Sequence, residues 1–507
     1  MSLIVILLIL VVFVTGYYAW LHTYWRRKGV SGPRGLPFLG SFYELADVNS
    51  PRVFIIRKWA KKFGKVFGFY EGATPVLVVG DPEMLQELFI RKFENFNARK
   101  TTNYIHGDLE NEKEEPLVNV FFSQGNRWKK LRALNNPALS VKSLRIIHDN
   151  MENSIICMVD LFSKIKEDTP FNIHEYFQEL TYDVICRTAL GTSFSNQWNN
   201  KEIKLVQTMF TKTHRVLPWY LAILFPYFEN AVKNVFILHE NVRGGNSLKL
   251  WMYCRTAVGT KYKEWLENVK LGIENPPADF IDMFLEYYSE TLKNCERPVK
   301  IDILNSITGS CFAFLVAGYD TTANTLAYAC HMLMKHPEKL EQAQKEIDEI
   351  CTSDNISFDD MSKLKYVDAI IKETLRLFPV GWFACSRQCV TPTTLGDYYI
   401  DAGVRIEADV GALHLSKEIW GDNAEEFVPE RWLDSTPRHV MSWIPFGAGP
   451  RQCVGMRMGL SEAKTTLAHV LKKYTLYAGP ETEKELKYQG CATISPEKVT
   501  VYLKSRN

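Results

Sequence analysis

The hydrophobic pattern of the chain begins with one long apolar run. Residues Leu3–Leu21 contain no Asp, Glu, Lys or Arg, and a helix of about 20 such residues is long enough to cross a bilayer. Arg26, Arg27 and Lys28 follow the run, and no basic residue precedes it. The positive-inside rule therefore places the N-terminus in the lumen and the remainder of the chain in the cytosol. A cleaved signal peptide is the competing interpretation, but it normally has a basic start and a shorter apolar core.

A segment rich in Pro and Gly follows this run. Residues 32–37 read GPRGLP and cannot continue a helix. We therefore predict a signal-anchor transmembrane helix in residues 1–25, a basic Pro/Gly hinge in residues 26–40, and a body in residues 41–507. We find no internal repeat, and no linker-like Ser/Gly or charged tract interrupts residues 40–500.

The periodicity of the body changes along the chain. Two short strand-like runs with a Gly-containing turn between them predict a β-hairpin, and helical periodicity dominates from about residue 82 to 380. A second strand-and-turn region, another amphipathic run and a final strand-like run follow. The hairpin is Val66–Tyr70 with Pro75–Val79; the clearest helices are Val141–Lys164, Ile301–Lys335 and Pro337–Cys351; the later segments are Ser386–Arg405, Gly455–Tyr474 and Lys498–Leu503. The pattern predicts a mainly α body with a small β region.

A second very apolar stretch, Pro218–Phe228, is too short to span a membrane and is broken by Pro226. It fits two interpretations equally well. One is a segment of the core, and the other is a monotopic contact with the membrane beside a substrate entrance.

Composition narrows the functional classes. The 507 residues are 46% hydrophobic, with 60 Lys and Arg against 58 Asp and Glu, which excludes a disordered or low-complexity chain. A formal net charge of +2 gives no general field for nucleic acid, so we expect no DNA or RNA partner. The eleven cysteines form no CxxC pair. We expect reduced thiols in a protein that faces the cytosol, most of them buried as small apolar residues.

One cysteine lies in a different setting. Residues 446–455 read FGAGPRQCVG, so that Cys453 ends a Gly-rich loop just before a predicted amphipathic helix. Small residues let backbone N–H groups approach the sulfur, and the helix presents its positive N-terminus to a thiolate. Phe446 is placed to shield the site from water. The alternative is a buried cysteine in a tight turn, which is what we expect for the other ten.

This loop resembles the haem-ligand loop of the cytochromes P450, the haem-thiolate monooxygenases. The resemblance implies a cytochrome P450 fold, with a single catalytic domain behind the N-terminal helix. It also implies haem b (iron protoporphyrin IX) as cofactor, with Cys453 as its axial iron ligand. Other landmarks of the family occur in the expected order, and each has its own physical basis.

The residues Glu373 and Arg376 match the family's ExxR motif. A spacing of three residues puts both side chains on one helix face, although such pairs are also common on solvated helices. Residues 427–432 (FVPERW) resemble the segment whose arginine, here Arg431, binds that pair. The resemblance implies a buried ion network that braces the cysteine loop and has a structural role.

The segment 317–322 (AGYDTT) lies inside the long predicted helix. Polar residues are unfavourable there unless they are used, and Thr321 can donate to the carbonyl of Ala317 and open a local groove. A packed helix kink is the alternative. The segment resembles the family's oxygen-activation helix, which implies Asp320 and Thr321 as the proton-delivery pair. We expect Ala313, Ala317 and Thr321 to line the haem and substrate side.

Several further residues are expected around the cofactor. Trp128 and Arg132 match the family's WxxxR motif, so that the indole N–H and the guanidinium would reach a haem propionate. Without that context the segment is a surface amphipathic turn. Arg387 and Arg451 are further propionate candidates, whereas we expect His414 to be a packed core histidine.

The resemblance implies the insertion of one oxygen atom of O2 into a hydrophobic small molecule of the xenobiotic, steroid or fatty-acid-like type. The thiolate favours O–O cleavage. No strand-linked GxGxxG indicates a nicotinamide or flavin site, so electrons should come from a separate protein. The resemblance implies NADPH–cytochrome P450 reductase for this role, with cytochrome b5 as an optional second partner. Several lysines could form a basic docking face, although an ordinary solvated surface is equally consistent: Lys129, Lys130, Lys464, Lys472 and Lys473.

Within the family, the chain resembles the microsomal drug- and steroid-oxidising family 3, which places it in the endoplasmic reticulum membrane with its catalytic domain in the cytosol. In this interpretation Ser495 lies on a hairpin that borders the pocket. Two other functional classes remain open. One is a haem-thiolate isomerase or dehydratase, against which Asp320 and Thr321 speak, and the other is a non-catalytic haem sensor or carrier.

Overall fold

The architecture is that of a computed structural model of the whole chain. It describes residues 3–45, 51–99, 119–212, 245–274, 276–434, 436–490 and 493–506, together with isolated residues between 221 and 238.

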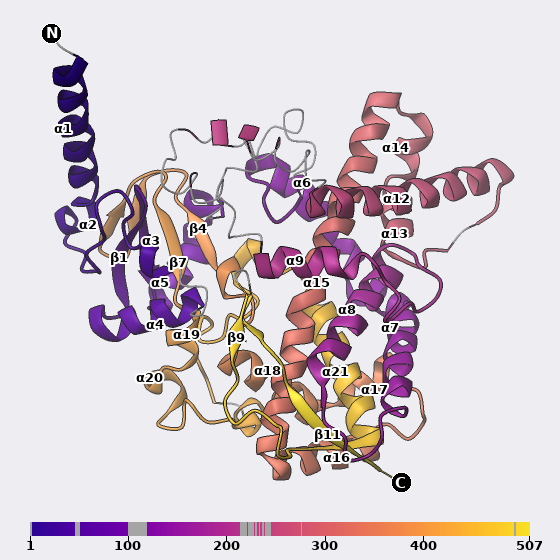
Figure 1. Cartoon of the computed structure of the whole chain (residues 1–507). Helices are drawn as coiled ribbons and strands as arrows, with labels where there is room; N and C mark the ends of the chain where they lie inside the picture. Colours follow the sequence, from indigo (N-terminus) through magenta and orange to yellow (C-terminus); the bar gives the residue numbers. More distant parts are fainter. Residues whose placement is uncertain are drawn as a thin grey trace.

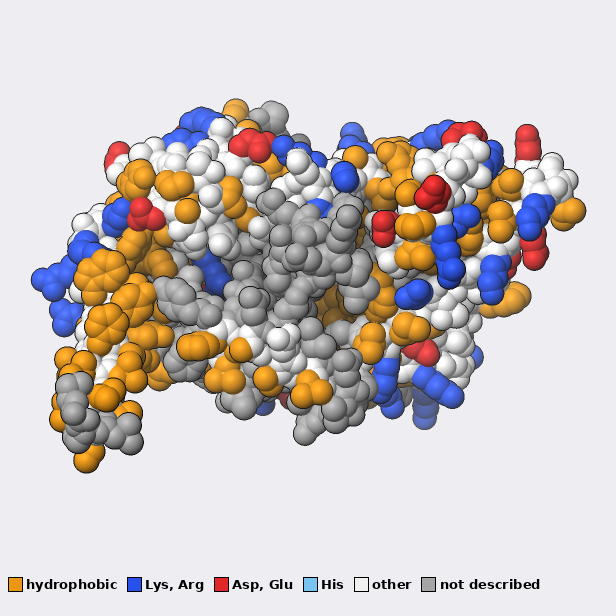
Figure 2. Space-filling view, turned by 90° about the horizontal axis from the view of Figure 1, so that it is seen from above, with side chains coloured by type: hydrophobic (Ala, Val, Ile, Leu, Met, Phe, Trp, Pro, Cys, Tyr) orange, Lys and Arg blue, Asp and Glu red, His pale blue; other side chains and the backbone are white. Residues whose placement is uncertain are grey.

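The N-terminal helix α1 (Leu3–Leu21) projects from one end of the body (Figure 1). Its 18-residue window Ile4–Leu21 has a mean hydropathy of 2.5 and is only 6% buried. Seen from above, hydrophobic side chains gather at the lower left, where α1 projects, and basic side chains lie beside them (Figure 2). The other helix apolar enough to span, Arg297–Lys335, is 44% buried and belongs to the core. The structure thus supports one candidate membrane anchor, at the N-terminus.

The segment after α1 is attached to the body. Helix α2 (Tyr24–Arg27) buries Trp25, whose indole Nε1 donates to the carbonyl of Phe69 at 3.0 Å. Gly68 lies under this ring, and a Cβ there would be 2.4 Å from it. The phenol of Tyr24 donates to Asp401 at 2.7 Å. These contacts fix the exit of the anchor against the first sheet.

That sheet has four strands, in the order β1-β2-β7-β4. The predicted hairpin is present as β1 (Val66–Glu71) and β2 (Thr74–Val79). Strand β7 (Arg405–Ala408) runs parallel to β2, and β4 (Ser386–Gln388) is antiparallel to β7. Three smaller sheets pair β5 (Thr393–Leu395) with β6 (Tyr398–Ile400), β9 (Tyr488–Gln489) with β10 (Ser495–Pro496), and β11 (Thr500–Ser505) with both β3 (Phe171–Asn172) and β8 (Tyr474–Tyr477).

Helices form most of the body, as the periodicity predicted. The longest is α15 (Arg297–Lys335), which passes through the centre and packs most extensively on α8 (Ile173–Ala189) (Figure 1). The other helices of at least eight residues are α4 (Arg52–Phe63), α6 (Gly125–Ala138), α7 (Val141–Phe162), α9 (Ile203–Lys212), α12 (Asn246–Leu271), α13 (Phe280–Tyr287), α16 (Pro337–Ile350), α18 (Lys365–Leu377) and α21 (Met456–Lys473).

Short helical segments connect these elements. They are α3 (Phe42–Leu45), α5 (Pro82–Gln86), η1 (Glu87–Arg91), η2 (Phe93–Phe96), α14 (Ser289–Asn294), α17 (Phe358–Lys363), η5 (Trp382–Ala384), α19 (Val410–His414), α20 (Lys417–Trp420), η6 (Pro429–Trp432) and η7 (Gly449–Arg451).

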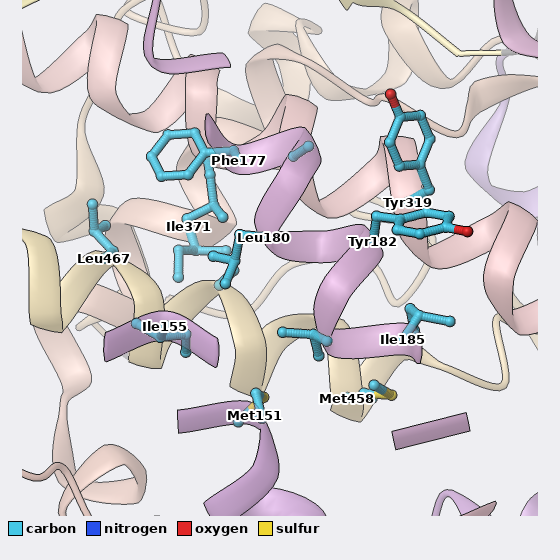
Figure 3. Close-up of a cluster of buried hydrophobic side chains, with 14 of the residues drawn as sticks. Met151, Ile155, Phe177, Leu180, Tyr182, Ile185, Tyr319, Ile371, Met458 and Leu467 are labelled. Carbon is cyan, nitrogen blue, oxygen red and sulfur yellow. The ribbon is translucent and has the colours of Figure 1, made fainter. Parts of the chain in front are cut away.

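The core lies where α7, α8, α15, α18 and α21 meet. Figure 3 shows Phe177 and Leu180 of α8 beside Ile371 of α18 and Leu467 of α21, with Ile155 of α7 below them. Each of these side chains is fully buried, which stabilises the fold by roughly 1.5–3 kcal/mol per residue. This core fixes α15 and α21 relative to one another. Helix α15 carries the AGYDTT segment, and α21 begins directly after the cysteine loop.

The predicted helix and strand positions agree with the structure to within a few residues. The predicted contact of Pro218–Phe228 with core or membrane falls outside the described residues, apart from Leu221 and Phe228.

Candidate active site

The cysteine loop is a compact turn held by its own backbone. Gly447 N–H donates to the carbonyl of Ile444, and Cys453 N–H donates to the carbonyl of Phe446, both at 2.9 Å. Gly449 adopts a φ of +69°, and a Cβ at this position would lie 2.0 Å from the carbonyl oxygen of Phe89. Only glycine permits this approach. The loop ends at Gly455, and α21 begins at the next residue.

Cys453 differs from most other cysteines of the chain. It is exposed, whereas seven of the other nine described cysteines are buried. Desolvation by the surrounding protein raises the pKa of the thiol, although the residue as a whole is exposed. The N–H of Gly455 and the guanidinium groups of Arg99 and Arg132 lower this pKa. These groups would stabilise a thiolate bound to a metal. Among the described residues there is no group of three or more His, Cys, Asp or Glu side chains that could hold a metal ion.

Three buried arginines lie close to this loop. Arg99 donates to the carbonyls of Ala384 (2.9 Å) and Arg451 (3.2 Å). Arg451 donates to the carbonyls of Asn97 and Ser123, and Arg387 donates to those of Ser386 (2.8 Å) and Ala448 (3.3 Å). Their guanidinium groups stack on aromatic rings, with centroid distances of 4.2 Å for Arg99 over Phe121, 4.6 Å for Arg387 over Phe89 and 4.6 Å for Arg451 over Trp128. We call these three residues the arginine cluster.

The arginine cluster has no counter-charge among the described residues. Three buried atoms, Nε of Arg99, Nε of Arg387 and Nη1 of Arg451, have no hydrogen-bond partner there. Burial and, to a smaller extent, the neighbouring arginines lower the pKa of these guanidiniums to about 10, 9 and 8 respectively. Buried cations with free N–H groups are costly unless an anion joins them. The two propionate carboxylates of haem fit this requirement in charge and in hydrogen bonding.

The WxxxR residues lie beside the same loop. Helix α6 buries Trp128 under Arg451, and Arg132 donates to the carbonyl of Gln452 at 2.6 Å. Arg132 therefore holds the residue before Cys453, and half-burial lowers the pKa of its guanidinium. The structure thus brings Trp128, Arg132, Arg387 and Arg451 to one region around Cys453.

The predicted ion network is present on α18. Glu373 and Arg376 are fully buried and joined by two hydrogen bonds of 2.8 Å, and Arg431 of η6 donates from Nε to Glu373 at 3.0 Å. Trp432 Nε1 and the backbone N–H of Val428 also donate to this carboxylate, at 2.9 and 3.0 Å. Backbone carbonyls accept from the remaining guanidinium groups: those of His414, Ala424 and Glu426 from Arg376, and those of Trp420 and Asn423 from Arg431.

His414 connects this network to the cysteine loop. Its Nε2 accepts from the N–H of Ile444 at 2.9 Å, so its Nδ1 carries the proton and donates to the carbonyl of Arg376 at 3.2 Å. Burial, with Arg376 nearby, lowers the pKa of His414 to about 3. A second connection is aromatic, since Trp443 contacts both Trp432 (5.3 Å between centroids) and Phe446 (6.1 Å). His414 is thus a core histidine, and the ring of Phe446 packs against Trp443.

Helix α15 presents a small-residue face. Ala317 is exposed and Ala313 and Thr321 are partly exposed, whereas the neighbouring Leu315 and Tyr319 are buried. The hydroxyl of Thr321 donates to the carbonyl of Ala317 at 2.8 Å. These residues leave one side of the central helix open next to the core.

Asp320 points away from this face. It is only 2% exposed, and its Oδ2 accepts from Asn324 Nδ2 at 2.7 Å and from the hydroxyl of Thr493. Adjacent residues of a helix do not share a face, which explains why Asp320 and Thr321 diverge. The Asp320 carboxylate and the Thr321 hydroxyl therefore have different hydrogen-bond partners in this structure.

The sequence did not identify every residue of this region. Arg99 follows η2 in the unremarkable stretch 96–99 (FNAR), which matches no motif. Trp432 and His414 were recognised as residues of the right segments, but not as partners of Glu373 and Ile444. Arg99 lies among polar residues, in the stretch 94–103 (ENFNARKTTN), so nothing in the sequence distinguishes it from a surface arginine.

Comparisons with known proteins agree with the geometry. The cytochrome P450 family model matches residues 30–502. The Caenorhabditis elegans protein cytochrome P450 cyp-13B1 is 60% identical over 509 residues, covering 100% of both chains. Cytochrome P450 CYP13A1 of the same organism is 39% identical, covering 97% of each chain, and CYP13A10 is 38% identical, covering 97% of this chain and 96% of the relative. The chain belongs to the cytochrome P450 family, the oxidoreductases that bind haem through a cysteine thiolate and act as monooxygenases.

Proposed function

We propose that Cys453 is the thiolate ligand of the haem iron, and that the protein oxygenates an apolar small molecule at a membrane. The observation that carries this proposal is the accessible Cys453 sulfur, which lies next to buried arginines that lack a counter-charge. When bound, haem supplies the activation of O2 at its iron, and thiolate ligation favours O–O cleavage. The polypeptide supplies binding, orientation and protons.

The chain's residues have separate tasks in this proposal. Arg387, Arg451 and Arg132, together with Arg99 and Trp128, bind and orient the propionates. Phe446 covers the sulfur side of the loop. The ion network of Glu373, Arg376 and Arg431 keeps the loop rigid, because both carboxylate oxygens of Glu373 accept hydrogen bonds from the two arginines.

Protons reach the other side of the site through α15. Asp320 is the acid, and Thr321 is the hydroxyl closest to the open face. The bond from Thr321 to the Ala317 carbonyl supports this assignment, since it holds the hydroxyl at a groove of the helix.

The location follows from the N-terminal segment. Residues 1–25 form a single-pass anchor in the endoplasmic reticulum membrane, residues 26–40 form the hinge, and residues 41–507 form the haem-binding domain in the cytosol. Helix α1, with Arg26, Arg27 and Lys28 at its end, supports this orientation. Apolar substrates that partition into the bilayer suit an enzyme held at this surface, and the microsomal drug- and steroid-oxidising type is the group we favour.

The electron donor is NADPH–cytochrome P450 reductase, with cytochrome b5 as a second donor. Of the expected lysines, Lys464 is 14% exposed and paired with Asp368 at 3.3 Å, and Lys472 donates to the Cys351 carbonyl at 2.8 Å. Neither is available for docking. Lys129 and Lys130 of α6 are exposed and lie on the helix that contacts Gln452. Lys129 pairs with Glu94 at 3.5 Å but keeps 54% of its side chain exposed, and we propose the docking face at these two residues.

Reconstitution tests this function directly. The purified full-length protein, combined with the reductase, NADPH and a steroid probe such as progesterone under ¹⁸O2, should give a product with one ¹⁸O atom. Turnover should fall as salt rises, because docking is electrostatic. Rearrangement of an organic peroxide without NADPH would instead indicate an isomerase or dehydratase. Absence of turnover across diverse apolar probes would favour a haem sensor.

A further inference from the structure

A polar cavity lies on the side of α15 opposite its open face. It has a volume of about 80 Å³, which is enough for several water molecules. Its floor includes the buried residues Asp320, His174 and Thr493, and the exposed Glu175 and Glu497 stand at its mouth. Helices α8 and α15 and the β9–β10 hairpin therefore enclose a passage from solvent to the Asp320 carboxylate.

A chain of hydrogen bonds holds the carboxylate at this floor. Asn324, one turn beyond Asp320 on α15, donates from Nδ2 to Asp320 Oδ2 at 2.7 Å. The Oδ1 atom of Asn324 lies 2.7 Å from Nε2 of His174 and accepts from Ser495 Oγ at 3.0 Å. His174 of α8 and Ser495 of the β9–β10 hairpin thus hold the Asp320 carboxylate indirectly, through Asn324.

The chemistry of the chain fixes the state of His174. A carboxylate only accepts, so the amide nitrogen of Asn324 must face Asp320 and its oxygen must face His174. His174 Nε2 must then carry a proton and donate it. Burial lowers the pKa of His174 despite the nearby Asp320, which is consistent with a neutral ring that has its proton on Nε2.

We propose that His174 is a positioning residue for proton uptake: through Asn324 it holds Asp320 in the polar cavity, where the carboxylate takes protons from solvent. Cavity water passes a proton to the Asp320 carboxylate and takes a replacement proton from bulk solvent. The acid then gives that proton to water beside the Thr321 hydroxyl on the open face and becomes a carboxylate again. His174 touches none of the reacting groups. Without the His174 N–H, the amide of Asn324 keeps only the donor from Ser495 to hold its oxygen away from Asp320, and the orientation of the carboxylate is weakened. This proposal rests on the oxygenase reaction described above.

The test compares two substitutions of one residue. In H174Q the side-chain amide can place an N–H near the position of Nε2, whereas in H174N the side chain is too short to reach Asn324. H331N is the matched control, because His331 is also a buried histidine and lies on α15 itself. The full-length holoenzymes are mixed with reductase and NADPH, and NADPH oxidation is followed in H2O and in D2O.

We expect H174N to oxidise NADPH about tenfold more slowly, which is less than the loss of about a hundredfold or more expected when the proton-transfer group itself is removed. Its solvent deuterium effect should be larger than that of the wild type, because proton uptake becomes limiting. H174Q and H331N should keep the wild-type rate and isotope effect, and all variants should keep their haem content. Independently of turnover, the changes in thermal midpoint of H174N and D320N should be non-additive in the double variant, since both act on one hydrogen-bonded chain.

An H174N enzyme with the wild-type rate and isotope effect would overturn the proposal. A loss shared by H174Q, or one accompanied by loss of haem, would overturn it as well, because either result marks a purely structural role. Failure of the proposed function would instead appear in the wild type, which would not consume NADPH with the reductase.

Discussion

Two regions of this protein bury arginine equally deeply, but only one of them provides a carboxylate partner for it. In the ion network, Arg376 is fully buried and its charge is matched by Glu373, with backbone carbonyls taking its other N–H groups. In the arginine cluster, Arg387 is 1% exposed, faces no described carboxylate and leaves Nε unpartnered. The first region finds a carboxylate partner and its hydrogen-bond acceptors within the polypeptide. The second is complete only when an anion joins it, and this distinguishes an internal brace from a binding site.

The same substitution in both regions should give different losses. Arg376→Met leaves Glu373 with one fewer guanidinium and frees the carbonyls of His414 and Ala424. Removing one partner of a buried ion pair costs about 3–5 kcal/mol. We expect a protein that purifies without haem and unfolds at markedly lower denaturant concentration, measured by circular dichroism, and Glu373→Ala should behave alike. An Arg376→Met protein with full haem content and activity would contradict the role of the network.

Arg387→Met should affect the cofactor and spare the fold. The substitution removes a desolvated cation whose hydrogen bonds the propionates would otherwise receive, and hydrogen bonds to charged groups contribute about 1.5–3 kcal/mol each. We expect haem to transfer to apomyoglobin about tenfold faster or more, with unchanged far-ultraviolet circular dichroism. An equal loss of helical signal in both methionine variants would erase the distinction between the two regions.

A smaller effect concerns the histidine between these regions. His414 has a pKa of about 3 in the folded protein, below its ordinary value near 6.5. The folded state therefore disfavours protonation, so its stabilising contribution is present above about pH 6.5 and is lost as the pH falls toward 3. Between pH 7.5 and 5.5 this loss is about 1.4 kcal/mol.

His414→Gln tests that dependence. The variant cannot titrate, so its free energy of unfolding should fall by about 1.4 kcal/mol less than that of the wild type over the same pH range. The measurement is denaturant unfolding at both pH values. Identical pH dependence in the two proteins would show that His414 is not held neutral in the folded state.

Sequence reasoning succeeded where periodicity or a fixed motif carried the information. The long helix predicted at Ile301–Lys335 and the hairpin predicted at Val66–Tyr70 and Pro75–Val79 follow from periodicity. The approach of Arg431 to Glu373 follows from the resemblance of residues 427–432 to a family segment. The helix and the hairpin depend on local sequence patterns, and the ion network depends on specific residue types, Glu and Arg.

The remainder depended on contacts between distant segments. Arg99 joins the cluster because the chain after η2 passes beside Arg451, and the pairing of His174 with Asn324 links residues 150 positions apart. The lysines expected at a docking face were plausible by charge alone, but Lys464 lies against Asp368 and is mostly buried. The periodic pattern of the sequence contains no information about these contacts between distant segments.

The most direct test of the whole account is the absorption spectrum of the dithionite-reduced protein under carbon monoxide. The wild type should show the red-shifted Soret band that thiolate ligation produces, and Cys453→Ser should lose that band. A colourless wild type, or a Cys453→Ser protein with the same band, would show that this sulfur does not bind the iron.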